Sequence, residues 1–206
     1  MKNSIFTASV LSVALGLTAC ASSAQSPAGP GSDAKRSAPS ARVVESTITT
    51  THVVLSSQKP FEVAVKDLEA ELGKASTELL GNRLSASKNF AELTAEMEPL
   101  AGRSGLITVA ELNWGKVMSR VPVNMKARLF VIGNPLTAKK LLEAGGPDVG
   151  LYLPTKIFVY QDKQGVTQVS YDKMAPIMAQ YKNPQLNAVA EKIDETLAKL
   201  ASSAAL

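Results

Sequence analysis

Residues 127–133, with the sequence ARLFVIG, form an almost uninterrupted apolar run. Such a run is typical of a central strand that is buried on both faces of a sheet. Asn134 and Pro135 follow at once, and these residue types suit the N-cap and the first position of a helix. The segment therefore predicts a central strand that leads directly into a helix, which ends at Gly145-Gly146-Pro147.

The neighbouring segments add further strands and helices. Residues 153–172 predict a β-hairpin whose turn is Asp162-Lys163-Gln164-Gly165. The Val- and Thr-rich residues 43–55 predict a long strand, and a helix is expected to follow from Pro60 to Gly73. Because a hairpin breaks the strict alternation of strands and helices, we expect a single compact α+β domain with a mixed or antiparallel sheet and packed helices.

Three further segments complete this expectation. Residues 105–112 predict a strand, and a C-terminal helix is expected over residues 183–206, with Asn183 as its cap and an apolar stripe at helical spacing. Residues 74–104 are ambiguous, although Ser87 could cap a helix that Pro99 would end.

The start of the chain has the pattern of an export signal. Lys2 precedes a short apolar run over residues 5–17, and small residues lead to Cys20, the only cysteine. The run is too short to span a membrane, which takes about 20 apolar residues. The sequence LTAC at 17–20 resembles the lipobox of bacterial lipoproteins. This resemblance implies that a signal peptide over residues 1–19 is removed and that Cys20 carries diacylglycerol and a further acyl chain such as palmitate.

The lipobox resemblance also implies a location. Two or three acyl chains on one residue give stable membrane anchoring, and Ala21 in place of Asp favours the outer membrane, with the protein facing the periplasm. A free thiol or an intermolecular disulfide at Cys20 are the alternatives. Residues 20–42 are expected to be a flexible linker, because 21–41 contain no large apolar side chain that could be buried.

Composition argues against several classes of function. The net charge is +4, and the basic residues are scattered rather than gathered in the stripe that nucleic acid binding requires. His52 is the only histidine, and the cysteine is committed to the anchor, so no zinc site is expected. The chain also lacks a recognisable catalytic triad or phosphate loop. We therefore expect no nucleic acid partner, no metal and no cofactor.

Residues 128–172 resemble a family known as domain of unknown function 302. The shared features are an apolar strand that ends in Gly133-Asn134-Pro135, a helix with paired leucines, Leu153-Pro154 before a strand, and a strand that ends in Ser170-Tyr171. The resemblance implies a small α+β sandwich whose biochemical role is not established.

The resemblance also implies domain boundaries and a site. It places the family-like domain at residues 43–182, with 74–104 as an insertion and the C-terminal helix beyond the shared region. Members of the family often carry an Asp-His pair after the second strand, where this sequence has Asn113 and Trp114. An ionisable group is thus replaced by an aromatic face, which suits an apolar or planar ligand rather than proton transfer.

These observations favour a membrane-tethered periplasmic binding or interaction module over an enzyme. Its partners would be membrane lipid, through the acyl chains of Cys20, and a small ligand or another protein. A small ligand would contact Asn113, Trp114, Gly133 and Asn134, with the 74–104 insertion covering it. Simpler roles stay open, with Asn134 as a helix cap and Trp114 as a core residue. The alternative function is an enzyme with an unrecognised active site near Asn113 and Asn134.

Overall fold

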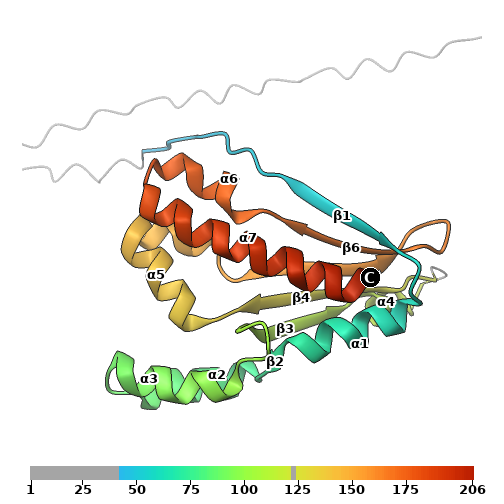
Figure 1. Cartoon of the computed structure of the whole chain (residues 1–206), viewed down its shortest axis with the longest axis horizontal. Coiled ribbons are helices and arrows are strands. Elements are labelled where there is room, and N and C mark those ends of the chain that lie inside the picture. Colours follow the sequence, from blue (N-terminus) through green and yellow to red (C-terminus); the bar gives the residue numbers. More distant parts are fainter. Residues whose placement is uncertain (1–41, 122–123) are drawn as a thin grey trace, which may run out of the picture. The chain divides into compact units, whose positions relative to one another are not determined.

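Six strands form one mixed sheet in the order β1-β6-β5-β4-β3-β2 (Figure 1). The computed structural model describes residues 42–121 and 124–206, and residues Glu45–Leu206 form one unit. β2 and β3 pair in parallel, whereas all other neighbours pair antiparallel. The strands are β1 (His52–Ser57), β2 (Gly73–Lys74), β3 (Ile107–Asn113), β4 (Ala127–Gly133), β5 (Thr155–Gln161) and β6 (Thr167–Asp172). The predicted α+β class with a mixed sheet is confirmed.

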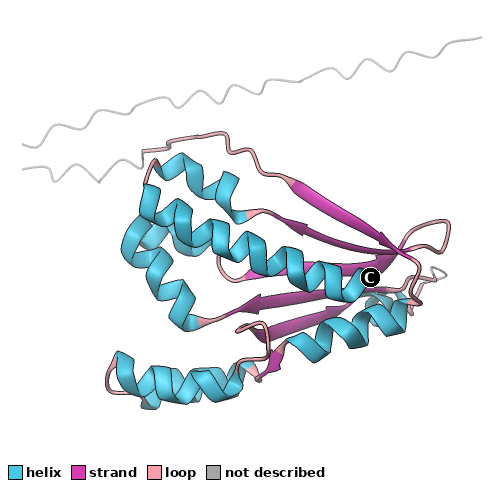
Figure 2. Ribbon diagram, in the orientation of Figure 1, coloured by secondary structure: helices cyan, strands magenta, loops and turns pink. Residues whose placement is uncertain are grey.

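Two helices cover one face of this sheet, as Figure 2 shows for the longest helix and its neighbour. These are α1 and α7, which pack against each other and against the strands. The helices are α1 (Phe61–Glu71), α2 (Thr77–Ala86), α3 (Phe90–Met97), α4 (Trp114–Met118), α5 (Pro135–Gly145), α6 (Met174–Met178) and α7 (Pro184–Ala205), with 3-10 turns η1 (Glu98–Leu100), η2 (Pro147–Tyr152) and η3 (Ala179–Tyr181).

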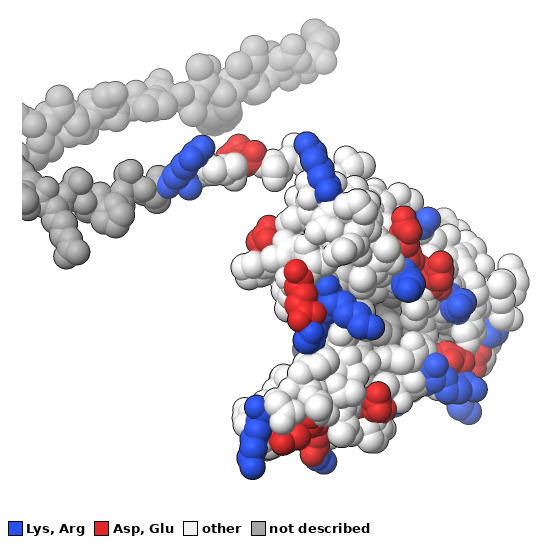
Figure 3. Space-filling model, turned by 60° about the vertical axis from the view of Figure 1, so that its left-hand side comes forward, with Lys and Arg blue, Asp and Glu red and all other residues white. Residues whose placement is uncertain are grey.

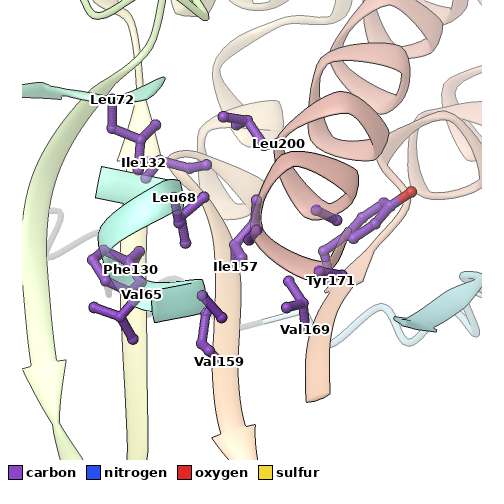
Figure 4. Packing of buried hydrophobic residues seen from close by; sticks show 14 of the residues in the cluster. Val65, Leu68, Leu72, Phe130, Ile132, Ile157, Val159, Val169, Tyr171 and Leu200 are labelled. Carbon is purple, nitrogen blue, oxygen red and sulfur yellow. The ribbon is translucent and has the colours of Figure 1, made fainter. Parts of the chain in front are cut away.

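The main core lies between the sheet and these two helices. Figure 4 shows Phe130, Ile157 and Val169 gathered on the side of the sheet that meets α1 and α7. Leu68 of α1 and Leu200 of α7 complete the cluster from the helix side. Each such side chain contributes about 1.5–3 kcal/mol when it is fully buried, so this layer holds the sheet and both helices together.

The strands β4 and β5 occupy the centre of the sheet, as the sequence predicts. The prediction that 127–133 is buried on both faces is wrong. Phe130 and Ile132 are buried under the helices, whereas Leu129 and Val131 point to the opposite face and are only half-buried. The reason is that α1 and α7 cover one face, and the opposite face keeps apolar side chains such as Val54 in contact with solvent.

The ends of several elements differ from the sequence-based expectation. Residues 42–51 form no strand, because the ladder with β6 begins only where His52 faces Asp172. α1 begins at Phe61, with Pro60 as its N-cap. The hairpin of β5 and β6 forms as predicted, with Gly165 at a φ of 79° in the turn. The predicted C-terminal helix is α7, which belongs to the same unit as the sheet.

The ambiguous stretch after α1 forms an excursion that leaves and rejoins the sheet at one point. A Cβ on Gly73 would lie 1.8 Å from the backbone oxygen of Leu100, and one on Gly102 would lie 2.3 Å from the backbone nitrogen of Gly73. Only glycine permits this approach. Between the two glycines the chain forms α2 and α3, and α3 is capped by Asn89 rather than by Ser87.

Candidate functional site

A cavity of about 340 Å³ lies beside the turn that joins β4 to α5. Gly133, Asn134 and Pro135 of this turn line it, together with Leu80 and Leu84 from α2. Figure 3 shows the side of the molecule that carries α5 and the α2–α3 pair, which is hollowed between that pair and the rest of the domain. The segment 74–104, expected to cover a ligand, therefore supplies one wall of this cavity.

The turn at the cavity is held by the side chain of Asn134. Its Oδ1 accepts a hydrogen bond from the backbone N–H of Leu136 at 2.8 Å, which caps α5. Its Nδ2 donates to the backbone oxygen of Gly105 at 2.8 Å and so ties the turn to the segment before β3. Both ends of the Asn134 side chain are thus occupied by the framework, which is the helix-cap role that the sequence left open.

The walls of the cavity carry no charge. The described residues that line it are apolar or neutral polar, and none is an Asp, Glu, Lys, Arg, His, Cys or Tyr. Its deep side is formed by Ile132, Leu141 and Met174, all buried. An uncharged wall cannot offset the desolvation of an ionic ligand, and it offers no group for proton transfer. The cavity is therefore suited to binding an apolar molecule.

A cation–π contact joins the start of α3 to α5. The Lys139 ammonium of α5 lies 4.8 Å from the centroid of the Phe90 ring at the start of α3. Arg83 of α2 and Glu96 of α3 form an ion pair that joins the two helices.

Leu84, which faces the cavity, is 50% exposed. An apolar side chain of α2 is thus accessible both to solvent and to the cavity.

Asn113 and Trp114 do not lie at this cavity. β3 and β4 are antiparallel, and Asn113 faces Arg128 near the start of β4, whereas Asn134 follows the end of β4. Six residues of strand separate the two positions by about 20 Å. The expectation that the Asn113-Trp114 pair and the Gly133-Asn134 turn converge is wrong, because adjacent antiparallel strands run in opposite directions and so end at opposite ends of the sheet.

The polar groups named for the enzymatic alternative are also dispersed. His52 lies on the edge strand β1, where its Nδ1 is 2.7 Å from Asp172 Oδ1, and both side chains are exposed. Asn113 caps α4, its Oδ1 accepting from the backbone N–H of Lys116 at 3.0 Å. Within residues 42–121 and 124–206, no group of three or more His, Cys, Asp or Glu side chains could hold a metal ion.

One strong pKa shift occurs outside the cavity. Desolvation and the nearby carboxylate of Asp148 raise the pKa of Tyr181 to about 12. An unperturbed tyrosine is also protonated at neutral pH, so this shift identifies no reactive group. Along the described part of the chain, no helix combines the length and the apolar character needed to cross a membrane.

Sequence reasoning missed the α2 contribution to the cavity. Leu80 and Leu84 are four residues apart and share one helical face, and Ser76 caps the helix by accepting from the backbone N–H of Leu79 at 3.0 Å. A serine before a pair of leucines at helical spacing is a signal that could have identified α2.

Comparisons with known proteins agree with this architecture. The sequence model of a family described as "Domain of unknown function DUF302" matches residues 82–204. The match begins inside α2 and includes most of α7. The resemblance read from the sequence places the C-terminal helix beyond the shared region, whereas the family model includes it. None of the curated proteins matches the chain.

A solved structure supports the same fold. It is described as an uncharacterized conserved DUF302 protein from Bacillus stearothermophilus. The similarity has a TM-score of 0.52 at 17% sequence identity, and it covers 74% of this chain and 97% of that chain. At this identity the similarity concerns the fold alone.

Proposed function

The chain belongs to the DUF302 family, and we propose that it is a membrane-tethered periplasmic module whose cavity binds a small, uncharged apolar molecule. One observation carries the proposal, namely the cavity of about 340 Å³ with uncharged walls beside the Gly133-Asn134-Pro135 turn. Ligand pockets in proteins have volumes of about 300–1,000 Å³ and are lined mostly by apolar side chains. The cavity lies at the small end of this range.

The lining supports a ligand class. Leu80, Leu84 and Ile132 offer apolar contact, while Thr137 and Thr155 add hydroxyl groups that can orient a neutral polar substituent. Burial of apolar surface contributes about 25 cal/mol per Å², whereas a charged group would enter without a partner. The ligand is therefore a compact planar or short aliphatic molecule without net charge.

The tether is the second part of the proposal. Cys20 lies outside the described residues, and the lipobox-like sequence at 17–20 is what supports its lipidation. A Cys20 that carries acyl chains such as palmitate would hold the domain at the outer membrane, facing the periplasm. Cys20→Ser should leave an unprocessed precursor or release the protein from membranes. Normal-sized, membrane-bound protein from this variant would contradict lipidation.

Binding can be tested with a neutral solvatochromic dye, N-phenyl-1-naphthylamine. Leu84→Glu places a carboxylate on the cavity wall at a position that is 50% exposed, so the helix should still fold. Val63→Glu is the matched control, because Val63 is 42% exposed on α1 and does not line the cavity. We expect at least a tenfold loss of dye affinity for Leu84→Glu and none for Val63→Glu, since an apolar dye that occupies the cavity would take water away from the new carboxylate without offering it a partner.

The outcome that contradicts the proposal is equal dye affinity in the parent, Leu84→Glu and Val63→Glu proteins. Native mass spectrometry of protein purified from its own membrane then identifies the natural ligand as a mass that the parent retains. The folded Leu84→Glu protein should lose this mass, and the Val63→Glu protein should keep it.

A further inference from the structure

Exposed apolar side chains gather in one short segment between β3 and β4. Leu112, Trp114, Val117, Val121 and Met125 are 42%, 37%, 53%, 47% and 40% exposed. Large apolar residues exposed singly are normal on protein surfaces, whereas a contiguous group marks an interaction site. The segment therefore calls for a partner.

The local fold brings these side chains onto one surface. Trp114 and Val117 are three residues apart on α4 and share one of its sides, and Val121 lies in the turn just after the helix. Met125 is held against α4 by a close backbone contact, because a Cβ on Gly115 would lie 2.6 Å from the Met125 carbonyl oxygen. Trp114, Val117, Val121 and Met125 therefore make up an exposed apolar patch on and beside α4, and Leu112 lies near the end of the strand that leads into it.

Three basic residues lie within and beside this patch. Lys116, Arg120 and Lys126 are exposed, and no ion pair among the described residues includes them. The sequence contains no acidic residue between Glu111 and Glu143. The segment from Leu112 to Lys126 therefore carries three exposed basic side chains and no acidic one. The carboxylates beside it are Glu111, which pairs with Arg128, and Asp162, which follows Gln161, whose backbone N–H donates to the carbonyl oxygen of Lys126. We call the α4 surface the set Leu112, Trp114, Lys116, Val117, Arg120, Val121, Met125 and Lys126.

We infer that the α4 surface docks on an anionic lipid bilayer. Tryptophan is enriched at the boundary between lipid and water, where its apolar ring and polar N–H are both accommodated. Exposed aliphatic side chains insert shallowly into the same region, and each lysine or arginine near anionic headgroups adds electrostatic attraction. The α4 surface carries all three elements.

A second copy of the chain fits this surface less well. A two-fold symmetric interface would place the same patch on both sides. Lys116, Arg120 and Lys126 of one copy would then approach the same residues of the other without an acidic partner in the patch. Like charges brought together in this way oppose association, whereas anionic lipid neutralises them.

The α4 surface is independent of the proposed ligand cavity. It lies at the end of the sheet where β3 ends and β4 begins, and the cavity lies where β4 ends. A failure of ligand binding would therefore leave the membrane inference untouched, and the reverse also holds.

The experiment uses Trp114 as its reporter, because it is the only tryptophan in the chain. Full-length protein is reconstituted into vesicles of phosphatidylcholine alone or of phosphatidylcholine and phosphatidylglycerol in equal parts. We expect a blue shift of Trp114 emission, with quenching by bromine-labelled lipid, only in the phosphatidylglycerol vesicles. In about 1 M salt, where the Debye length is about 3 Å, the shift should disappear.

A charge-reversed variant provides the second test. Lys116→Glu, Arg120→Glu and Lys126→Glu combined should abolish the shift, whereas the same change at the exposed Lys140, Lys182 and Lys192, outside the α4 surface, should retain it. Circular dichroism confirms folding, and the salt series of the unchanged protein stands without any variant. Equal emission in neutral and anionic vesicles, or a blue shift that grows with protein concentration in the absence of lipid, would overturn the inference, the latter in favour of a second copy.

Discussion

Asn113 and Asn134 make the same hydrogen bond at opposite ends of one antiparallel strand pair. Each Oδ1 accepts a backbone N–H of the helix that follows its strand, from Lys116 at 3.0 Å and from Leu136 at 2.8 Å. β3 therefore passes into α4 at one end of the sheet, and β4 passes into α5 at the opposite end. The two asparagines position the α4 surface and the cavity, respectively.

The cap at Asn134 should have a measurable stability. Asn134→Ala removes the acceptor for Leu136 N–H and should lower the free energy of unfolding by about 0.5–2 kcal/mol. Asn134→Ser retains a capping hydroxyl and should recover part of this loss, although it too lacks the Nδ2 bond to Gly105. Urea unfolding compares the variants. Equal losses for Ala and Ser would contradict a capping role.

A second helix start depends on a residue from another helix. Asp194 of α7 accepts the backbone N–H groups of Met174 at 2.5 Å and Ala175 at 3.1 Å, the first residues of α6. Asp194→Ala should lower the free energy of unfolding by about 1–3 kcal/mol, because two amides lose a charged acceptor. Asp194→Asn, which keeps one acceptor oxygen, should fall between the two proteins in the same denaturant titration.

The same aspartate allows a spectroscopic check. Desolvation, and secondarily the charge of Asp194, raises the pKa of Tyr171 above its usual value. Asp194→Asn should therefore lower the Tyr171 pKa while leaving it raised by burial. An NMR titration with labelled tyrosine measures this shift, and an unchanged Tyr171 pKa would show that the Asp194 charge does not reach the ring.

The two faces of β4 should respond differently to truncation. Phe130→Ala removes a ring that is 1% exposed beneath α1 and α7, and it should cost about 3–5 kcal/mol. Leu129→Ala acts on the half-buried opposite face and should cost less than 2 kcal/mol, since about half of the transfer free energy is already absent. Chemical denaturation measures both. A loss at Leu129 equal to that at Phe130 would mean that the opposite face is covered.

The turn between β5 and β6 should weaken in acid. Asp162 accepts hydrogen bonds from the Gln168 side chain at 2.8 Å and from the backbone N–H groups of Val166 and Gln164 at 2.9 Å each. The Gln168 bond, followed by the backbone bonds, lowers the pKa of Asp162 in the folded protein. A lowered folded pKa means that the stabilisation is present above the unfolded pKa, near pH 4, and is lost as the pH falls below it.

Amide exchange can follow this change. The Gln164 and Val166 amides should exchange faster as the pH falls below about 4, after correction for the intrinsic pH dependence. Asp162→Asn serves as the control, because it cannot titrate and its protection should show no such step. A step of the same size in Asp162→Asn would assign the acid sensitivity to another group.

Short-range features of the fold could be predicted from the sequence, and long-range ones could not. The passage from β4 through Asn134 into α5 and the hairpin around Gly165 depend on neighbouring residues, and local patterns identify both. The start of β1 depends on which residues β6 can pair with, and the one-sided burial of β4 depends on where α1 and α7 pack. Composition contains neither relationship.

The candidate site shows the same division. Local residues identified Asn134 as a helix cap, whereas Asn113 was identified through the family resemblance, and both asparagines precede a helix. Their separation follows from the antiparallel direction of β3 and β4, which no local pattern specifies. The contribution of Leu84 to the cavity likewise depends on how the α2–α3 excursion folds back against α5.

Gly73 and Gly102 lie in close contact, so the α2–α3 excursion begins and ends at the same place in the fold. The carbonyl oxygen of Leu106 accepts hydrogen bonds from the backbone N–H groups of both glycines, at 2.9 Å and 3.0 Å, so the two ends of the excursion are bonded to one carbonyl group. Because the two ends of the segment meet, its length can change without altering the path from α1 to β3, provided that Leu80 and Met97 still cover Ile107. Because that segment forms a wall of the cavity, ligand preference could diverge among relatives through this one replaceable part while the sheet and its helices stay as they are.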